Sequence, residues 1–480
     1  MKVALIVPPL LGYKGDPFGN IPSIPTGAPY LAAYLRANGH AVDIVDCFGE
    51  SPHQVRPFKT QYEARGLSPA GVLARLPADL GLAGISVHSG AAHGLAIELI
   101  RALKGWNPDL PIVVGGAQAT VLHGAFLEAG ADYVVLSEGE ASLLQLAEAL
   151  EGRGEIRAID GLAWGGGLNR RTRFIQDLDA LPFPAIDLLP MRNYWDLRYA
   201  HGPVVGPYTF LLTSRGCPYS CAFCATPCIW QRRWRARSAG NVVDEMEHYV
   251  REFGIRDFHI QDDNFTVQRE RVWAICQEIL DRRLEVTWCL PSAVKAEPID
   301  PQTLHVMREA GCRYIAFSPE SGSPRVLELM RKPVDLEHVK RMVEAAHKEG
   351  MKTQACFVLG FPGETEADLE LTRRYANKLT RRGVDEISFF IMSPVPGAAA
   401  FDEHAWDFED YEGLCWSPRW RPDYERLSRA RLKLYANFFW TRLWSHPLDL
   451  LGHVPHILAG RHETKSEMAV NRWLRMLAGR

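Results

Sequence analysis

The stretch Thr213-Ser-Arg-Gly-Cys217-Pro-Tyr-Ser-Cys221-Ala-Phe-Cys224 holds three cysteines with the spacing C-x3-C-x2-C. It follows the apolar run Tyr208-Thr-Phe-Leu-Leu212, which predicts a buried strand. The cysteines should therefore lie on a loop just beyond the end of that strand. Three thiolates on one short loop can converge on one metal centre, because soft sulfur ligands suit both zinc and iron–sulfur clusters.

The number of thiols on this loop bears on which metal it would hold. A 4Fe–4S cluster bound by three thiolates keeps one iron open for a substrate or a cofactor. A structural zinc site needs a fourth protein ligand, and Cys228 follows closely enough in sequence to keep zinc open. The loop by itself therefore predicts a metal centre without deciding between a cluster and zinc.

The composition of the whole chain narrows the class of protein. A chain of 480 residues is expected to form two to three domains, and its net charge of −3 does not indicate nucleic-acid binding. Its ten cysteines do not resemble a secreted disulfide framework and favour a metal in a reducing compartment. The apolar N-terminus is broken by Pro8 and Pro9, which predicts a strand and not a signal peptide. We therefore expect a cytoplasmic protein.

Residues 1–155 alternate between apolar runs and helical patterns, which predicts a doubly wound, Rossmann-like parallel sheet with helices on both faces. Ligands of such sheets bind beyond the carboxyl ends of the strands. The segments expected there are rich in Gly, Ser and Thr, which lets the backbone approach a ligand; the alternative is that they are only tight turns. These segments are Val7-Pro-Pro-Leu-Leu-Gly12, Ser86-Val-His-Ser-Gly90, Gly115-Gly-Ala-Gln-Ala-Thr120 and Ser137-Glu-Gly-Glu140.

Residues 156–202 are expected to form a hairpin around Gly165-Gly-Gly167 and an extended linker. The alternation restarts in residues 203–400 and predicts a partial (β/α)6 barrel, similar to a TIM barrel with two units fewer. Its strands are predicted at 209–213, 256–261, 285–290, 313–318, 353–359 and 386–391. A polar or Gly-rich motif follows each predicted strand, where such barrels carry their active sites, so the second half is expected to be catalytic.

Residues 401–480 are predicted to form a helical region that is rich in tryptophan and, beyond Arg419, in basic residues. The pattern over 424–444 predicts an amphipathic helix. Its apolar face would comprise Leu427, Leu434, Tyr435, Phe438, Phe439 and Leu443. This face either packs on the barrel or contacts a membrane or a hydrophobic substrate.

The cysteine spacing, with Phe223 directly before the last cysteine, resembles the signature of the radical S-adenosylmethionine (SAM) enzymes. Glu320-Ser-Gly-Ser323 is similar to the fourth-strand segment of that family, which contacts the ribose and amino-acid part of SAM. Phe357-Val-Leu-Gly-Phe-Pro-Gly-Glu364 is similar to the fifth-strand segment that holds adenine. The resemblance implies that Cys217, Cys221 and Cys224 bind a 4Fe–4S cluster, with Cys228 outside it. It also implies a SAM site made of Phe223, Asp262, Glu320, Ser321, Gly360, Phe361, Pro362 and Gly363.

Asp262-Asp-Asn-Phe265 resembles the second-strand motif of one large branch of this family. The two carboxylates form either an acid–base pair or a strand-end motif that hydrogen-bonds the cofactor or loop backbone. The same branch carries an N-terminal cobalamin-binding domain, which residues 1–155 resemble in Thr26-Gly-Ala-Pro-Tyr-Leu-Ala-Ala-Tyr-Leu35 and Gly115-Gly-Ala-Gln-Ala-Thr120. The resemblance implies a cobalamin site made of Pro9, Thr26, Gly27, Ser86, Gly115, Gly116, Gln118, Thr120, Glu138 and Gly139.

The resemblance also implies a mechanism. The three thiolates hold three irons of the cluster, and the amino and carboxylate groups of SAM chelate the fourth. An electron from the reduced cluster cleaves the sulfonium to give a 5′-deoxyadenosyl radical, which removes hydrogen from an unactivated carbon. The protein orients and shields these cofactors, and a barrel interior suits that task because it excludes water and stray hydrogen donors.

A lower cobalt ligand can come from a histidine in the pattern Asp-x-His-x-x-Gly, which residues 1–155 lack. His88 and His93 lie near a strand end without that spacing, and we interpret His88 as a polar loop or core histidine. The family branch implies cobalamin bound without a histidine ligand, which should favour moving a methyl group off cobalt. We therefore predict that methylcobalamin methylates the substrate radical and that a second SAM re-methylates the cobalamin.

The predicted function is methylation of an unactivated carbon on a small molecule, and the aromatic tail suggests a hydrophobic or secondary-metabolite substrate. A second hypothesis is radical chemistry without methyl transfer, as in oxidative cyclisation of a tetrapyrrole side chain or a rearrangement. A third is a metal or cobalamin binding protein without catalysis. Expected partners are a reductant such as flavodoxin or ferredoxin and, through the C-terminal region, a membrane surface. No nucleic acid is expected, although 230–237 interleaves Trp and Arg.

Overall fold

The computed structural model describes residues 1–16, 21–415, 417–459 and 462–477. The chain forms two compact units. The first comprises Met1–Asp196 together with two short segments from the C-terminal half, Val395–Gly397 and Phe408–Cys415, and the second comprises the other described residues. The two C-terminal segments of the first unit lie beyond the ranges that the sequence associated with the N-terminal half.

The first unit is built on a sheet with the strand order β10-β9-β8-β7-β6-β1-β3. Its strands are β1 (Lys2–Val7), β3 (Ala41–Asp46), β6 (Leu82–Ser86), β7 (Ile112–Gly115), β8 (Tyr133–Val135), β9 (Leu162–Trp164) and β10 (Gly167–Leu168). The five strands from β3 to β8 are parallel, and the β9–β10 hairpin continues the sheet in the antiparallel sense. The chain order reverses between β1 and β6, and doubly wound sheets bind their ligands at such a reversal.

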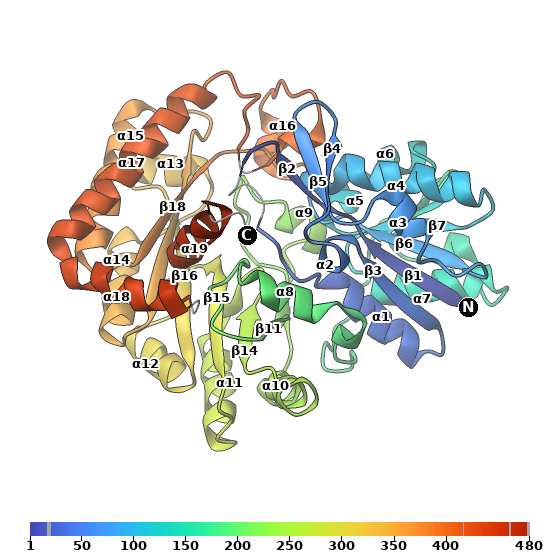
Figure 1. The fold of residues 1–480 in the computed structure, drawn as a ribbon, viewed down its shortest axis with the longest axis horizontal. Helices are drawn as coiled ribbons and strands as arrows, with labels where there is room; N and C mark the ends of the chain where they lie inside the picture. Colours follow the sequence, from blue (N-terminus) through green and yellow to red (C-terminus); the bar gives the residue numbers. More distant parts are fainter. Residues whose placement is uncertain (17–20, 416, 460–461, 478–480) are drawn as a thin grey trace. The chain divides into compact units, whose positions relative to one another are not determined.

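Helices cover both faces of this sheet, as the alternating sequence predicts. Figure 1 shows α1 and α7 on one face and α3, α4 and α6 on the other. The helices of the unit are α1 (Gly27–Ala37), α2 (Cys47–Glu50), α3 (Pro69–Leu73), α4 (His93–Trp106), α5 (Ala117–Val121), α6 (His123–Glu128), α7 (Glu140–Leu150) and α8 (Met191–Leu197). The core between the sheet and α4 is aliphatic, with Ile6, Ile85, Val114 and Leu99 almost fully buried.

The first unit also contains a small antiparallel sheet that the sequence did not predict. Its order is β2-β5-β4, formed by β2 (Leu10–Tyr13), β4 (Val55–Phe58) and β5 (Tyr62–Arg65). The rings of Tyr13 and Tyr62 pack 5.0 Å apart, and the Tyr62 hydroxyl donates to Asp410 at 3.2 Å. The sequence around β2 is rich in Pro and Gly and that around β4 and β5 is polar, so neither carried a period-2 apolar pattern.

The second unit is built on six parallel strands in sequence order, β11-β14-β15-β16-β17-β18. The strands are β11 (Tyr208–Leu211), β14 (Asp257–Ile260), β15 (Thr287–Val294), β16 (Cys312–Glu320), β17 (Lys352–Leu359) and β18 (Glu386–Ile391). Each predicted strand is present, and the partial (β/α)6 barrel is confirmed together with the Rossmann-like first sheet. Two strands run further at their carboxyl ends than predicted. β15 continues through Pro291 and Ser292, where its register against β16 shifts, and β16 continues to Glu320.

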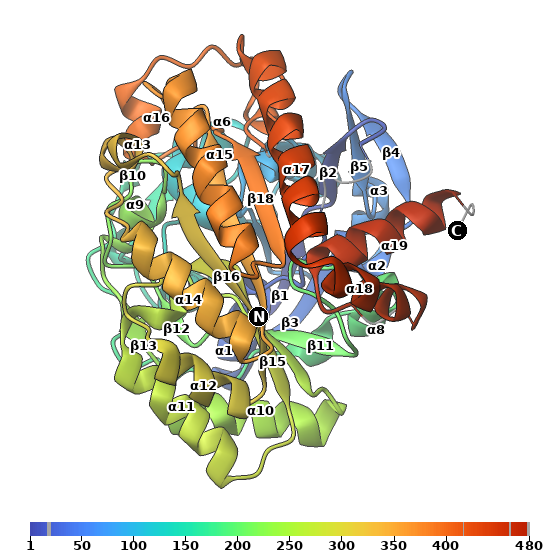
Figure 2. The ribbon, with the colours of Figure 1, turned by 90° about the vertical axis from the view of Figure 1, so that its left-hand side faces the viewer.

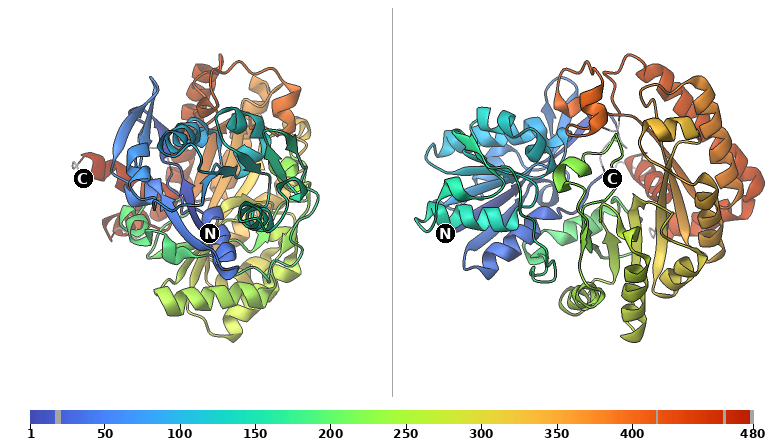
Figure 3. Two further views of the ribbon diagram at one scale, coloured as in Figure 1. Left: turned by 90° about the vertical axis from the view of Figure 1, so that its right-hand side faces the viewer. Right: turned by 180° about the vertical axis from the view of Figure 1, so that it is seen from behind.

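Helices follow the strands on one side of this sheet, and Figures 2 and 3 show them outside the strands. They are α9 (Thr226–Trp230), α10 (Ala239–Phe253), α11 (Arg269–Asp281), α12 (Pro301–Glu309), α13 (Pro324–Leu329), α14 (Leu336–Lys348), α15 (Glu366–Arg381) and α16 (Ala399–Glu403). Side-chain caps fix several starts, as where Thr365 and Asp368 form a capping box on α15. Some buried polar strand residues form ion pairs, for example Asp257 with Arg313 at 2.8 Å.

The C-terminal region is helical, with α17 (Tyr424–Ser445), α18 (Pro447–Ala459) and α19 (Lys465–Leu477). The expected apolar face of the first helix is only partly correct. Leu427, Leu434 and Phe438 are buried, whereas Phe439 and Leu443 are about half exposed at 55% and 49%. Successive helix residues are turned by about 100° from one another, so Phe439 cannot share the buried face of Phe438. None of the helices in the described part of the chain is both long and apolar enough to span a bilayer.

Candidate active site

The motifs predicted beyond the strands of the second unit gather at one edge of its sheet. The cysteine loop follows β11, Asp262 and Asp263 follow β14, Glu320 ends β16 and Gly360 follows β17. Carboxyl ends of parallel strands meet at one edge, so these groups face the same end of the barrel. Pro291 and Ser292 are the exception, because they lie within β15.

A short antiparallel ladder closes the base of the cysteine loop. The strands β12 (Ser214–Arg215) and β13 (Arg235–Ala236) pair just before and just after it. Between them Gly216 adopts φ +84°, and a Cβ at this position would overlap the carbonyl oxygen of Arg233. Only glycine suits this close approach, so the residue before Cys217 is fixed by geometry.

Two neighbouring carboxylates hold the ends of the loop. Asp262 is buried, and its oxygens accept hydrogen bonds at 2.6 Å from the Thr213 backbone and hydroxyl and from the Ser214 hydroxyl. Asp263 accepts from the Gly216 backbone at 3.0 Å and from the Thr226 hydroxyl at 3.4 Å. Both carboxylates therefore bond the loop, as one of the two sequence interpretations proposed. Contact of Asp262 with SAM stays a prediction.

The middle of the loop is held at Ala222, between the second and third cysteines. Its N–H donates to the Met330 carbonyl at 2.8 Å, and its carbonyl accepts from the Ala400 N–H at 2.7 Å. Ala222 also belongs to a small apolar cluster with Phe361, against which Phe223 packs. The loop is thus held at both ends and in the middle before any metal binds.

The three thiols are partly buried and electrostatically coupled. Burial raises the pKa of Cys217, with a further rise from Cys224 and opposing hydrogen bonds from Tyr219 and Asn264. Burial raises the pKa of Cys221 to about 11, and burial also raises the pKa of Cys224. The thiols are therefore protonated near neutral pH, and a metal must displace their protons to bind them as thiolates.

Two buried lysines face the triad. Lys332 donates to Glu320 at 2.6 Å and to Ser318 at 2.8 Å, and its ammonium lies 5.9 Å from the centre of the Phe223 ring. Burial alone would lower the pKa of Lys332, but the charges of Glu320 and Cys221 outweigh it and raise the pKa. Lys295 lies 4.5 Å from the Tyr219 ring, and burial lowers its pKa. Three thiols beside two cations fit a cluster that carries negative charge.

Cys228 lies apart from this arrangement, on the short helix α9. It is exposed, and the charge that acts on its thiol besides burial is Asp402 and not another cysteine. The structure thus gives no fourth thiol to the triad from this position. A cluster held by the three thiolates alone would keep one iron open for SAM, which stays what the resemblance implies.

The predicted SAM residues Glu320 and Ser321 lie at the end of β16. Glu320 has φ +60°, a strained conformation for a residue with a side chain, and such strain persists where surrounding contacts enforce it. For Glu320, the contact that enforces this conformation is its ion pair with Lys332. Ser321 is fully buried and shares a hydrogen bond with Thr372 at 3.2 Å. Gly322 packs against α15, where a Cβ would lie 2.6 Å from the Leu371 carbonyl.

The predicted adenine segment, Gly360 to Gly363, forms a tight turn after β17. Gly360 has φ +76°, and a Cβ there would overlap the side chain of Leu427 on α17. Its carbonyl accepts from Arg421 at 3.0 Å, and Arg421 also donates to the Met392 carbonyl at 2.7 Å. Phe361 is buried, Pro362 is half-buried and Gly363 has φ +85°. The start of α17 therefore supports this turn from behind.

Glu364 closes the turn with one carboxylate oxygen, which accepts from the Gly360 N–H at 2.5 Å. Its other oxygen, Oε1, is buried without a hydrogen-bond partner among the described residues. Burial raises the pKa of this carboxyl from 4.5 to about 7. A buried acceptor without a partner is costly, so Oε1 suits a donor from a bound molecule.

The predicted cobalamin residues of the first unit lie on loops at the carboxyl edge of its parallel strands. Pro9 follows β1, Ser86 ends β6, Gly115 ends β7 and Glu138 follows β8. Thr26 caps α1 without a side-chain hydrogen bond, and a Cβ at Gly27 would meet no atom within 4 Å. The edge is the one at which a doubly wound sheet binds its ligand.

Three of these loops are bonded to one another. Gly116 has φ +107°, and a Cβ there would lie 2.5 Å from the Val87 carbonyl beyond β6. The Thr120 hydroxyl donates to the Gly116 carbonyl at 2.9 Å and accepts from the Ser137 N–H at 2.7 Å. Gln118 is buried, and its amide nitrogen has no partner among the described residues. An orphaned amide on a glycine cradle fits a polar ligand such as the cobalamin macrocycle.

Glu138 and Gly139 lie on the loop before α7. One Glu138 oxygen accepts from the Ile175 N–H at 2.8 Å, so this buried carboxylate also holds the segment after the hairpin. A Cβ at Gly139 would lie 2.9 Å from the Leu31 side chain of α1. The loop therefore packs against the helix that begins at Gly27.

The two histidines near the end of β6 differ in environment. His88 is exposed, whereas His93 is buried between the rings of Phe126 and Tyr411 at 4.8 and 4.7 Å. Burial lowers the pKa of His93 to about 4, so this ring is neutral in the core. His93 is thus an aromatic packing residue of the first unit.

Sequence reasoning missed several residues of the candidate site. Lys332, Lys295 and Arg421 each reach it from a segment without a motif. Lys332 follows Glu320 by twelve positions, on the other side of α13, and no periodicity indicates that the two side chains meet. A preference for pairing buried carboxylates would have pointed to some cation, but not to this lysine.

Comparisons with known proteins agree with this architecture. The family model of the radical SAM superfamily matches residues 211–376, and that of the B12 binding domain matches residues 22–147. An uncharacterized methyltransferase of Pyrococcus horikoshii is 28% identical over 92% of both chains. The cytidylyl-2-hydroxyethylphosphonate methyltransferase of Streptomyces wedmorensis is 29% identical over 84% of this chain and 81% of its own. The anaerobic magnesium-protoporphyrin IX monomethyl ester cyclase of Rubrivivax gelatinosus is 27% identical over 92% and 77%.

Solved structures share the fold. The radical SAM methyltransferase TsrM of Kitasatospora setae, with tryptophan and a SAM analog bound, covers 84% of this chain and 75% of its own at 21% identity, with a TM-score of 0.66. The radical enzyme OxsB, with aqua-cobalamin and SAM bound, covers 91% and 56% at 18% identity, with a TM-score of 0.65.

A radical SAM domain and a B12-binding domain in one chain make the 4Fe–4S cluster, SAM and cobalamin its cofactors, as the sequence predicted. The thiol triad, the glycine turns and the two parallel sheets supply the matching sites. The chain therefore combines a radical SAM domain with a B12-binding domain, and in fold it resembles cobalamin-dependent radical SAM enzymes.

Proposed function

We propose that this enzyme methylates an unactivated carbon of a small molecule. The proposal rests on two sites that occur in one chain. One is a partly buried thiol triad beside two buried lysines, and the other is a B12-binding sheet that lacks the Asp-x-His-x-x-Gly pattern. Two of the relatives described above are named as methyltransferases, which supports the same reaction.

We assign the roles by segment. Residues 1–155 bind cobalamin, 156–202 form the hairpin and linker, 203–400 form the radical SAM barrel, and 401–480 form a C-terminal helical region. The triad Cys217, Cys221 and Cys224 holds the cluster. The SAM and cobalamin sites comprise the strand-end residues given above, from Phe223 to Gly363 and from Pro9 to Gly139.

When bound, the cluster and SAM would supply a radical that removes a hydrogen atom from the substrate carbon, and cobalamin would supply the methyl group that replaces it. The protein's own part is positioning. Asp262 and Asp263 hold the cysteine loop, Lys332 orients Glu320, and Arg421 supports the Gly360 turn. The apolar cluster that contains Phe361 keeps water from the underside of the loop.

Methyl-labelled SAM tests this proposal directly. The reconstituted enzyme is incubated with candidate small molecules, a reductant and SAM labelled in its methyl group. The expected result is a product that carries the label and is absent with the Cys221→Ala variant. A product that forms without the label would contradict methyl transfer.

A second candidate function is radical chemistry without methyl transfer. The observation that favours it is the similarity to anaerobic magnesium-protoporphyrin IX monomethyl ester cyclases, one of which aligns over 92% of this chain. In that case a tetrapyrrole side chain would be cyclised, and the labelled methyl group would remain on SAM or water-soluble by-products. The same labelling experiment distinguishes the two functions.

We further propose that flavodoxin or ferredoxin supplies the electron in the cytoplasm. The C-terminal region is proposed to touch a membrane surface peripherally. Exposed side chains support this contact, with Trp440 61%, Trp444 72% and Leu448 77% exposed on α17 and α18. Binding to vesicles that is lost when both tryptophans become Ser would support it, and unchanged binding would contradict it.

A further inference from the structure

Three metal-ligating side chains meet at the opposite end of the second unit from the cysteine loop. His347 lies in the last turn of α14, His446 lies between α17 and α18, and Asp449 lies in the first turn of α18. A helix that follows one strand of a β/α unit ends near the start of the next strand. The C-terminal end of α14 therefore lies at the amino edge of the sheet, and none of these residues belongs to the SAM site.

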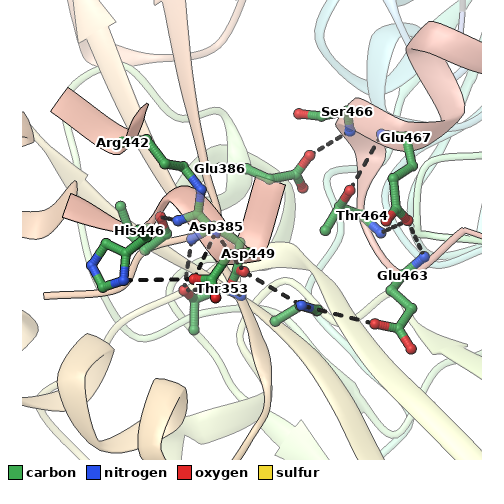
Figure 4. Close-up of polar contacts among 12 residues, drawn as sticks. Thr353, Asp385, Glu386, Arg442, His446, Asp449, Glu463, Thr464, Ser466 and Glu467 are labelled. Atoms are coloured by element: carbon green, nitrogen blue, oxygen red, sulfur yellow. Dashed lines mark hydrogen bonds and ion pairs between the residues drawn. The ribbon is translucent and has the colours of Figure 1, made fainter. Parts of the chain in front are cut away.

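One ligand atom from each of the three residues lies within 4.8 Å of the other two. The rings of His347 and His446 are 5.4 Å apart and nearly perpendicular. His446 Nδ1 lies 3.6 Å from Asp449 Oδ2, which Figure 4 marks with a dashed line. In a tetrahedral zinc site the ligand atoms lie about 2.0–2.2 Å from the ion, and so lie closer to one another than 4.8 Å. Small rotations of the three side chains would complete the site.

The orientation of His446 points its Nδ1 atom at the carboxylate. The other ring nitrogen, Nε2, lies 3.4 Å from the Arg381 carbonyl, where it can only donate. In the neutral ring this leaves a lone pair on Nδ1 facing a carboxylate oxygen, and two acceptors repel unless a cation lies between them. Metal-ligating histidines donate in this way to a backbone carbonyl through their second nitrogen.

The charges around Asp449 leave room for a cation. Its Oδ2 lies 3.4 Å from Arg442, but Arg442 is shared with Asp385, which lies 3.2 Å away. Figure 4 shows both carboxylates beside this one guanidinium, and the contacts of both run to its Nη2 atom. Arg442 is buried and fixes the position of the Asp449 carboxylate. Lys352 lies 3.7 Å from Asp385 and 3.9 Å from Glu463, so two cations serve three carboxylates here.

His347 is also held in place. Gly383 has φ +98°, and a Cβ at that position would overlap the His347 ring. The ring therefore packs directly on the backbone after α15, which limits its rotation. All three ligands are half-buried, which screens the site from water without closing it.

We propose that His347, His446 and Asp449 bind a divalent transition-metal ion, with Zn²⁺ as the preferred occupant. Two imidazoles and one carboxylate suit zinc, whereas the thiol triad suits the iron–sulfur cluster. Water would fill the fourth position. The ion would tie the end of α14 to the corner between α17 and α18, and so fasten the C-terminal region to the barrel.

The test uses the full-length, untagged, cluster-loaded protein under anaerobic conditions. Wild type and the variants His347→Gln, His446→Ala and Asp449→Asn are equilibrated with Zn²⁺ and dialysed, and zinc and iron are counted together by mass spectrometry. The expected result is one more zinc per chain in wild type than in each variant at equal iron content. The melting temperature should rise with Zn²⁺ in wild type and stay constant in the variants.

The matched control is His305→Ala. His305 Nδ1 lies 3.0 Å from Glu349 on the surface, a histidine–carboxylate pair for which the described residues offer no third ligand. This variant should keep the extra zinc and the zinc-dependent melting shift. Equal zinc content in wild type, His347→Gln and His446→Ala would overturn the proposal, as would an equal loss in the control. His347→Gln carries the test if the His446 variant does not fold, and equal iron contents show that the barrel is intact.

Discussion

Lys332 brings a buried positive charge to both the cysteine triad and the predicted SAM segment. It donates to Glu320 at 2.6 Å, and its charge lowers the pKa of Cys221 and Cys224 against the rise that burial causes. Removing one partner of a buried ion pair costs about 3–5 kcal/mol, because the other charge stays buried alone. The lysine therefore orients Glu320, and its charge would partly offset that of an anionic cluster bound to the triad.

Lys332→Gln should keep the cluster but slow SAM cleavage. We expect 5′-deoxyadenosine formation under dithionite to fall by about 10- to 100-fold, the range typical of groups that orient metal ligands. Iron content measures cluster loading, and Lys340→Gln, which removes an exposed ion pair with Glu337, is the control. Unchanged SAM cleavage in Lys332→Gln would refute this role.

Glu364 makes the stability of the second unit depend on pH. Its carboxyl pKa is raised from 4.5 to about 7, so the folded protein binds this proton more tightly than the unfolded chain does. The stabilisation is complete below pH 4.5 and is lost as the pH rises through 7. The full shift corresponds to about 3 kcal/mol at most.

Glu364→Gln cannot titrate and should remove this slope. Between about pH 4.5 and 7, the melting temperature of wild type should fall relative to that of the variant, and above about pH 7 the difference should level off. Thermal unfolding at several pH values gives the difference in melting temperature between wild type and variant. Other titrating groups contribute equally to both proteins and cancel in this difference, such as Asp46, whose pKa burial raises to about 6. Parallel pH profiles for the two proteins would contradict the assignment.

The segment that leads into α17 connects the C-terminal region to the SAM turn. Arg421 donates to the Gly360 and Met392 carbonyls, and Leu427 fills the space that a Cβ at Gly360 would need. Hydrogen bonds from a charged group are worth about 1.5–3 kcal/mol each. The turn after β17 therefore depends on an element some sixty positions further along the chain.

Arg421→Ala should raise the KM for SAM by about tenfold or more and change kcat less, because a loosened turn weakens binding before chemistry. Initial rates of SAM cleavage at several SAM concentrations measure both constants. Arg426→Ala serves as the control, since its ion pair with Glu366 is exposed and exposed pairs contribute little. An equal change in both variants would argue against a specific role for Arg421.

The strands and most helices were predictable from local sequence, because buried parallel strands form apolar runs between turn signals. Val3 to Ile6 and Phe357 to Leu359 are such runs, and both form the predicted strands. The place of the cysteine loop in the chain was predictable for the same reason, since the strand before it sets where the loop begins, whereas the contacts that hold the loop come from distant segments. The small sheet β2-β5-β4 was not, because its stability comes from distant partners such as Tyr62 with Asp410.

Side-chain partners across long stretches of chain were also beyond prediction. Nothing local to Lys332 indicates Glu320, and nothing local to Leu427 indicates Gly360. The apolar face of α17 was misjudged at Phe439 and Leu443, because the sequence shows hydrophobic residues but not which ones a neighbour covers. Asp262 and Asp263 were predicted as a pair at the right place, and the structure adds the hydrogen bonds that tie them to the loop.

At the scale of the whole molecule, one chain carries both a B12-binding sheet and a radical SAM barrel. The division at residues 155, 202 and 400 stays a prediction, and so does the absence of a histidine ligand to cobalt. His93 is committed to core packing between Phe126 and Tyr411, and His88 is exposed beyond β6. In the Asp-x-His-x-x-Gly pattern a carboxylate holds the histidine that binds cobalt, and neither His88 nor His93 lies in such an environment.

His88→Ala should therefore leave the bound cobalamin unchanged. We expect the paramagnetic resonance spectrum of the reduced, Co(II) form to lack nitrogen coupling from a histidine in both wild type and variant. Cobalamin content after purification gives the control for binding. A spectrum that shows such coupling in wild type and loses it in His88→Ala would contradict the prediction.

The most direct test of the central claim is the set of products formed from SAM. The cluster- and cobalamin-loaded enzyme is supplied with dithionite and SAM, and nucleosides are separated by liquid chromatography. We expect two products: 5′-deoxyadenosine from radical formation at the triad, and S-adenosylhomocysteine from methylation of cobalamin. The first product should be lost in the variants Cys217→Ala, Cys221→Ala and Cys224→Ala. A colourless protein that binds no iron and forms neither nucleoside would contradict the central claim.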